Sequence, residues 1–233
     1  MGDVRLEKKK GKFAAWFDNF WYHYKAQTLI AAGLIVTALI CTTQILTNDK
    51  YDYYVLYAGP QILAVQDLTY IQRAFADVGT DQNGDGEVKV AVKDIVMLSP
   101  EERATAAAEK DAEFNAEFIQ TEMTEFYQQI MAGEATVYLL SPYMYEQAKE
   151  SKLFMPLTEI FGEMPESAYD ETGILLSETA FGNSFNGVDD LPDDTILCIR
   201  QITSFQNMKN SKQAQKSFAA NLEFFKAVVN YEG

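Results

Sequence analysis

A short acidic segment in the first half of the chain carries the clearest pattern of metal-binding side chains. Oxygen-bearing residues occupy every second position there, and glycine occupies the sixth, giving the run Asp81, Asn83, Asp85, Gly86 and Glu87. Calcium takes about six to eight oxygen ligands, and a tight glycine turn lets several of them converge from one segment. Glu87 would contribute its backbone carbonyl oxygen. The segment therefore predicts a structural Ca²⁺ site that fixes a connection between a helix and a strand.

The same segment departs from the helix–loop–helix calcium motif, the EF-hand, in two ways. Its twelfth position is Val92 instead of glutamate, so the bidentate carboxylate is missing, and a strand-like segment follows where the motif has a helix. A replacement ligand would have to come from Asp77 or from a more distant acid. The alternative is a polar turn whose Asn and Asp side chains accept hydrogen bonds from their own backbone.

The scarcity of histidine and cysteine argues against most catalytic mechanisms. The chain has one histidine, His23, and two cysteines, Cys41 and Cys198. A serine or cysteine nucleophile usually needs a histidine base, and zinc usually needs histidine or cysteine ligands. Phosphate-binding, dinucleotide-binding and Gly-x-Ser-x-Gly patterns are absent from the sequence. We therefore expect a protein that is not an enzyme. A carboxylate-based extracellular hydrolase is the alternative, because acidic residues are abundant.

The net charge of −15 is distributed unevenly along the chain. Residues 1–28 hold six Lys or Arg and three acids, whereas the remainder holds 13 basic and 31 acidic residues. An acidic body argues against a nucleic-acid partner, which requires a basic face. The contrast between a basic head and an acidic body suggests that the two parts lie in different environments.

An uncharged apolar segment separates these two parts. Thr28 to Leu46 contains no charged residue, and roughly 20 apolar residues are enough for a helix to cross a bilayer. We predict a transmembrane helix over 28–47 that is retained as an anchor. The positive-inside rule then places a basic tail, residues 1–12, in the cytoplasm and residues 48–233 outside the cell membrane.

Residues 13–27, just before this span, are rich in aromatic side chains. Six of them recur at helical spacing: Phe13, Trp16, Phe17, Phe20, Trp21 and Tyr24. Together with the neighbouring lysines they predict an interfacial helix on the lipid bilayer. Gly33 and Thr37 form a weak small-x-x-x-small pair within the span, which leaves open a structural or sensor subunit that pairs with another membrane protein.

The outer part alternates between strand-like and helix-like segments. Strands are predicted over 52–58, 88–98, 135–141 and 195–200, and helices over 62–78, 100–133 with a break near Asp111, from 142 onwards, and over 214–229. Residues 157–194 have weak periodicity and are predicted as an irregular insertion. This order predicts an α/β fold, a doubly wound, mostly parallel sheet in three layers forming a single lobe, preceded by the transmembrane helix.

A ligand site in such a sheet is expected where the strands end. Ligands of open α/β sheets bind outside the carboxyl ends of the strands. The residues expected there are Gly59, Gln61, Ser99, Ser141, Tyr143 and Arg200. A small solute is the ligand this position suggests. The alternative is that Ser99 and Ser141 are plain helix caps and that Arg200 forms a surface ion pair.

Three segments carry a family resemblance. They are the strand ending Tyr57-Ala-Gly-Pro60, the run Ala135 to Pro142 followed by Lys152-Leu-Phe-Met-Pro-Leu-Thr-Glu159, and the C-terminal helix with Phe224-Phe225. Together they resemble one lobe of the extracellular solute-binding proteins of ABC importers, of the second periplasmic-binding-protein type.

The run Trp21 to Lys25 is similar to a segment of single-pass envelope proteins of Firmicutes. Taken together, the two resemblances imply a membrane-anchored binding domain that is accessory to an envelope or transport complex.

Overall fold

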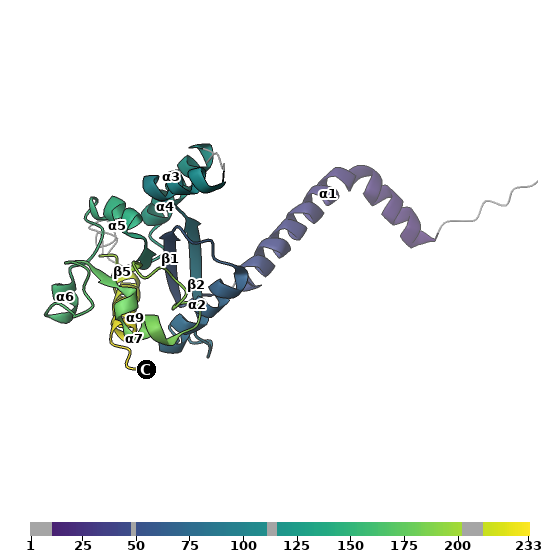
Figure 1. Ribbon diagram of the computed structural model, residues 1–233. Helices are drawn as coiled ribbons and strands as arrows, with labels where there is room; N and C mark the ends of the chain where they lie inside the picture. Colours follow the sequence, from purple (N-terminus) through teal and green to yellow (C-terminus); the bar gives the residue numbers. More distant parts are fainter. Residues whose placement is uncertain (1–10, 48–49, 111–115, 202–211) are drawn as a thin grey trace, which may run out of the picture. The chain divides into compact units, whose positions relative to one another are not determined.

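The protein is described by a computed structural model that covers residues 11–47, 50–110, 116–201 and 212–233 (Figure 1). The chain divides into two compact units, Met1–Asp49 and Lys50–Gly233. The break predicted near Asp111 and most of the predicted basic tail lie outside the described residues.

The described part of the first unit, residues 11–47, contains one helix, α1, over Lys12–Thr47. Its stretch Asn19–Thr43 is long and apolar enough to cross a membrane, and none of it is buried against protein. Hydroxyl groups in this stretch donate to carbonyls of the same helix, as Thr37 does to Gly33 at 3.0 Å and Thr42 to Ala38 at 2.7 Å. Such internal bonding suits a helix surrounded by lipid, where no water is available.

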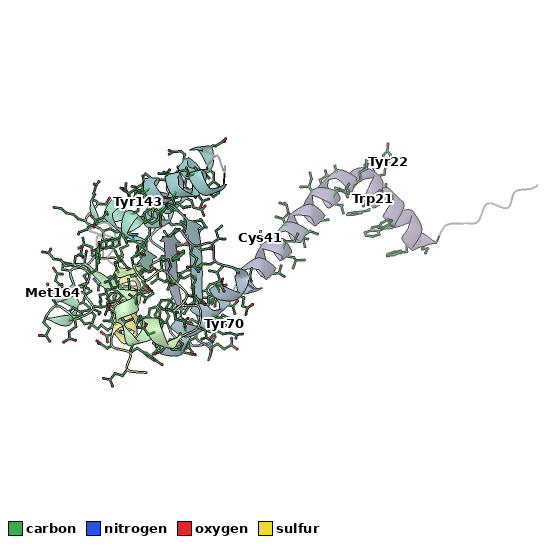
Figure 2. The ribbon with its side chains drawn as sticks, viewed as in Figure 1. Trp21, Tyr22, Cys41, Tyr70, Tyr143 and Met164 are labelled. Atoms are coloured by element: carbon green, nitrogen blue, oxygen red, sulfur yellow. The ribbon has the colours of Figure 1, made fainter. Side chains whose placement is uncertain are left out.

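The predicted interfacial and spanning segments belong to this one continuous helix. Figure 1 shows that α1 bends, and Figure 2 places Trp21 and Tyr22 at the bend. Aromatic rings ahead of it stack one turn apart, with ring centroids 5.6 Å apart for Trp16 and Phe20 and 6.1 Å for Phe17 and Trp21. The aromatic residues therefore cluster at one end of the helix.

The second unit is built on a five-stranded sheet, and all four predicted strands are confirmed. Its elements follow the chain in this order: β1 (Tyr53–Gly59), α2 (Val65–Val78), β2 (Val90–Val96), α3 (Pro100–Lys110), α4 (Ala116–Ala132), β3 (Val137–Leu140), α5 (Pro142–Lys149), α6 (Leu157–Phe161), β4 (Gly173–Leu175), η1 (Leu176–Glu178), α7 (Ala180–Ser184), β5 (Ile196–Ile199) and α9 (Lys212–Val229). Strand β4 lies inside the segment that was predicted to be irregular.

The strands are arranged in the order β2-β1-β3-β5-β4, and the sheet is mostly parallel. Strand β1 pairs in parallel with both β2 and β3, whereas β5 runs antiparallel to β3 and to β4. Only β5 opposes the direction of the other strands. The chain passes from β4 to β5 through η1 and α7.

Apolar clusters cover both faces of the sheet. Side chains of β1 alternate between them, so Val55 and Tyr57 belong to one cluster while Leu56 and Ala58 belong to the other. Helices α2, α7 and α9 contribute to the first cluster, and α4 and α5 to the second; Figure 1 shows the two groups of helices on opposite sides of the strands. Residues on a doubly covered strand read as a continuous apolar run, which explains the composition of β1 and β3.

The aromatic centre of the first cluster supplies a test of this packing. Phe75 is fully buried, and its ring centroid lies 4.9 Å from that of Phe181 and 5.8 Å from that of Phe224. We expect Phe75→Ala to lower the free energy of unfolding by about 3–5 kcal/mol, because it removes apolar contacts and leaves a cavity. The change is measured by urea unfolding of the detergent-solubilised chain, monitored by the near-ultraviolet circular dichroism of its tyrosines.

The matched control is Phe118→Ala, because the Phe118 side chain on α4 is 50% exposed. We expect it to cost about 1 kcal/mol or less. Equal losses in the two variants would contradict the described core.

Candidate functional site

A groove lies at the carboxyl edge of the parallel strands, and we call it the carboxyl-edge groove. It has a volume of about 570 Å³ and is lined by Ser99, Pro100, Glu101, Glu102, Ser141, Pro142, Tyr143 and Asp194. Three of the six predicted ligand residues, Ser99, Ser141 and Tyr143, therefore come together as predicted.

The strand register explains why these three residues meet. Strand β1 lies between β2 and β3, so the segments that leave β2 and β3 flank its end. The backbone N–H of Ser141 donates to Ala58 at 2.9 Å, and that of Met97 donates to Gly59 at 2.8 Å. The starts of α3 and α5 are thereby brought to the same edge.

Both serines in the groove cap the helix that they precede. Ser99 and Glu102 form a capping box, in which the Ser99 hydroxyl accepts from the Glu102 N–H at 3.2 Å and the Glu102 carboxylate accepts from the Ser99 N–H at 2.6 Å. The Ser141 hydroxyl accepts from the Met144 N–H at 3.4 Å. The capping role predicted as the alternative is confirmed, and it leaves Tyr143 and the carboxylates as the groups best able to contact a ligand.

The groove is lined by negative charge, which disfavours the binding of anions. Its lining includes three carboxylates, from Glu101, Glu102 and Asp194, and no lysine or arginine among the described residues. Free N–H groups at helix starts attract anions, but three negative charges at the same edge outweigh that attraction. A neutral or cationic ligand suits this lining better.

Gly59 and Gln61 shape the end of β1 and do not line the groove. A Cβ atom on Gly59 would lie 2.6 Å from the Tyr57 hydroxyl, so the tyrosine ring requires glycine there. The Gln61 N–H donates to that hydroxyl at 3.3 Å. Burial raises the pKa of Tyr57 to about 12, and Asp194 and Glu102 add to the rise, so the hydroxyl stays protonated at neutral pH.

Arg200 lies at the opposite edge of the sheet, away from the other predicted ligand residues. Grouping it with them was wrong, because it assumed that β5 runs parallel to its neighbours. Ile199 is paired with Val137, the first residue of β3, and the Arg200 N–H donates to Thr136 at 2.9 Å. The guanidinium of Arg200 donates to the carbonyl of Ile130 and lines a smaller cavity of about 280 Å³.

The predicted calcium loop is closed by its own hydrogen bonds. Asp81 accepts from the N–H groups of Gly84 at 2.6 Å and Gly86 at 2.9 Å. Asn83 accepts from Asp85 at 2.9 Å, and Asp85 accepts from Glu87 at 3.0 Å. This is the bonding expected of the polar turn, although a carboxylate that accepts one such bond still has lone pairs for a cation.

Charges around the loop weaken the case for calcium. The Lys89 ammonium lies 3.0 Å from a Glu87 carboxylate oxygen and 3.9 Å from one of Asp85, so a cation is already present. Among the described residues, no cluster of three or more acidic, histidine or cysteine side chains is arranged to hold a metal. Asp52, which the sequence did not single out, anchors the loop to β1 by accepting from the N–H groups of Gln82, Asn83 and Lys89.

A second polar cluster, which we call the Asp170 cluster, was not anticipated. The Asp170 carboxylate accepts from the Tyr145 hydroxyl at 2.6 Å, from the Lys149 ammonium at 2.5 Å, and from the N–H groups of Thr172 and Gly173. Burial raises the pKa of Asp170, but these hydrogen bonds outweigh it and hold the pKa below its ordinary value. The cluster joins α5 to the segment before β4.

No protein-family model matches the chain, and no curated protein or solved structure gives a significant match. The resemblance to a solute-binding lobe therefore stays a prediction.

Calcium binding by the loop is directly testable. If the loop is a calcium site, isothermal titration of the detergent-solubilised chain gives saturable Ca²⁺ binding, and the double variant Asp81→Ala/Asp85→Ala abolishes it. Asp190→Ala, which removes an exposed carboxylate elsewhere, is the matched control and should bind normally. Absence of binding, or equal binding in the double variant, would establish the polar-turn alternative.

The Asp170 cluster predicts a pH-dependent stability. Because the folded pKa of Asp170 lies below its unfolded value, its contribution is complete above about pH 4 and is lost as the pH falls through the folded pKa. We expect Asp170→Asn to lower the free energy of unfolding by about 1–2 kcal/mol at pH 7, because the Tyr145 hydroxyl and two backbone N–H groups lose a charged acceptor, whereas the half-exposed ion pair with Lys149 is screened by solvent. The loss should shrink as the pH falls toward 3.

Urea unfolding at a series of pH values measures this difference. Asp190→Asn is the control, because its side chain is exposed, and it should change stability little at any pH. A loss in Asp170→Asn that is constant from pH 7 to pH 3 would contradict the described ion pair.

Proposed function

We propose that the protein is a single-pass membrane protein whose outer domain binds a solute or a protein partner. In this proposal α1 anchors the chain in the cell membrane with its basic end in the cytoplasm. The second unit is then an extracytoplasmic domain, a three-layer single lobe related to solute-binding proteins and accessory to an envelope or transport complex.

The proposal of a membrane anchor rests on one observation: the apolar side chains of α1 are exposed along the whole stretch that could span a membrane. A helix of this length in a water-soluble protein would bury one face against a core, whereas Asn19–Thr43 buries none of its residues. Such a surface is stable in a bilayer and not in water. The aromatic rings at the N-terminal end of α1 and the lysines before them fit the cytoplasmic interface.

The carboxyl-edge groove supports the binding role. It lies where open α/β sheets bind their ligands, and Tyr143 offers it an aromatic side chain. The hydrolase alternative needs two carboxylates that face a substrate; Glu102 is engaged by the Ser99 N–H, so Glu101 and Asp194 are the pair that a hydrolase would use. We favour binding because abundant acidic side chains are more often part of a solvated surface, and we propose that the loop from Asp81 to Glu87, with or without calcium, is structural.

Membrane topology is the first test. In intact cells, a membrane-impermeant maleimide should label Met164→Cys, whose side chain is exposed on the outer domain, but should label Lys12→Cys only after permeabilisation. The unmodified chain is the blank, because Cys198 is buried and Cys41 lies within the proposed membrane span. Labelling of Lys12→Cys alone in intact cells would reverse the proposed orientation.

The groove is tested separately. A photo-crosslinking amino acid at position 143 should give an adduct in intact cells that the same group at position 169 does not, because Tyr169 is an exposed tyrosine outside the groove. The Ser99→Ala/Glu101→Gln variant should reduce the yield at position 143. Equal adducts at both positions would reject the groove as a binding surface.

A further inference from the structure

The largest of the described cavities lies away from the carboxyl-edge groove. It has a volume of about 670 Å³, within the range of ligand pockets, and we call it the α5–α6 cavity. Its lining includes Lys149, Lys152, Phe154, Glu159, Asp170 and Glu171. They come from the end of α5, from the segment that leads into α6, from α6 itself and from the segment before β4.

The walls of this cavity are held by backbone hydrogen bonds. The Met155 N–H donates to Ile199 at 2.9 Å, the Gln201 N–H donates to Leu153 at 3.0 Å, and the Leu157 N–H donates to Glu171 at 2.8 Å. These bonds join three segments that are distant in sequence. A cavity whose walls are fixed before a ligand arrives loses little conformational entropy on binding.

Lys152 is held in an unusual backbone conformation at the rim. Its φ angle is +51°, and it is the one non-glycine residue with positive φ in the described part of the chain. The side-chain amide of Gln201 donates to its carbonyl at 2.5 Å. Glycine is favoured in this conformation, so a lysine there gives up backbone stability while placing an ammonium group on the cavity.

The charges on the cavity wall fall into two groups. Lys149 and Asp170 neutralise one another at 2.5 Å. In contrast, among the described residues no ion pair is formed by Lys152, Glu159 or Glu171. The lining thus presents one ammonium group and two carboxylates, all on exposed residues, that have no partner of opposite sign, beside the partly exposed Pro156.

A molecule that carries both signs would match this lining. We propose that the α5–α6 cavity binds a small zwitterion, an α-amino acid or a short peptide. The carboxylate of this ligand pairs with Lys152, and its ammonium group pairs with Glu159 or Glu171. Phe154 is only 4% exposed, and its ring is already stacked on that of Tyr145, with centroids 5.4 Å apart, so it offers little surface for the stacking typical of sugars. This inference does not depend on the carboxyl-edge groove.

The test is isothermal titration of the full chain in detergent with a panel of L-amino acids and di- and tripeptides. We expect at least one zwitterion to bind. Its C-terminal amide and its N-acetyl derivative, which each lack one charge, should bind at least tenfold more weakly. Lys152→Gln should lower the affinity for the zwitterion at least tenfold. It should also remove the difference in affinity between the zwitterion and its C-terminal amide.

Two further variants separate binding from folding. Lys152→Gly suits the positive φ angle, so its melting temperature should equal or exceed that of the unmodified chain while binding is lost. Lys226→Gln, on α9 and paired with Glu223, is the matched lysine control and should bind normally. Absence of binding to every member of the panel, or equal affinity for acid and amide, or unchanged affinity in Lys152→Gln, would overturn the proposal.

Discussion

Strand β1 is hydrogen-bonded along both of its edges and packed on both of its faces, and the remaining structure of the outer unit is arranged around it. Its pairing with β2 and β3 fixes the register of the three parallel strands. Its side chains alternate between the two apolar clusters, so β1 contributes to the packing on both faces of the sheet. The requirement for glycine at the end of this strand follows from the same packing, because Tyr57 fills the space next to Gly59.

The reversal at β5 distributes the polar groups of the domain. Parallel strands deliver Ser99 and Ser141 to one edge of the sheet, where the start of β5 also brings Asp194. The antiparallel direction of β5 then carries Arg200 to the other edge and Gln201 to the α5–α6 cavity. One change of strand direction thus separates an acidic groove from a cavity lined by charges of both signs.

Positive charge in the outer unit is scarce, and much of it is engaged. Lys93 pairs with Glu125 at 2.6 Å, Lys149 with Asp170, and Lys89 with the loop carboxylates. Exposed pairs of this kind contribute little stability, whereas the Asp170 cluster joins two segments through a carboxylate that is largely shielded from water. The Lys152 ammonium forms no ion pair among the described residues, and it differs from other such cations in lining the α5–α6 cavity.

The sequence by itself determined the features that depend on local pattern. The apolar helix, the four strands, three of them apolar runs and one with alternating valines, and the caps at Ser99 and Ser141 follow from hydropathy and from side-chain chemistry within a few residues. The meeting of Ser99, Ser141 and Tyr143 also followed, because parallel strands share an edge. Tertiary structure alone decided the direction of β5, and hence the place of Arg200, because strand direction depends on which neighbours a strand pairs with. It also decided the Asp170 cluster and the α5–α6 cavity, whose residues are separated by about 20 to 50 positions and meet only when the segments around α6 and β4 pack onto α5.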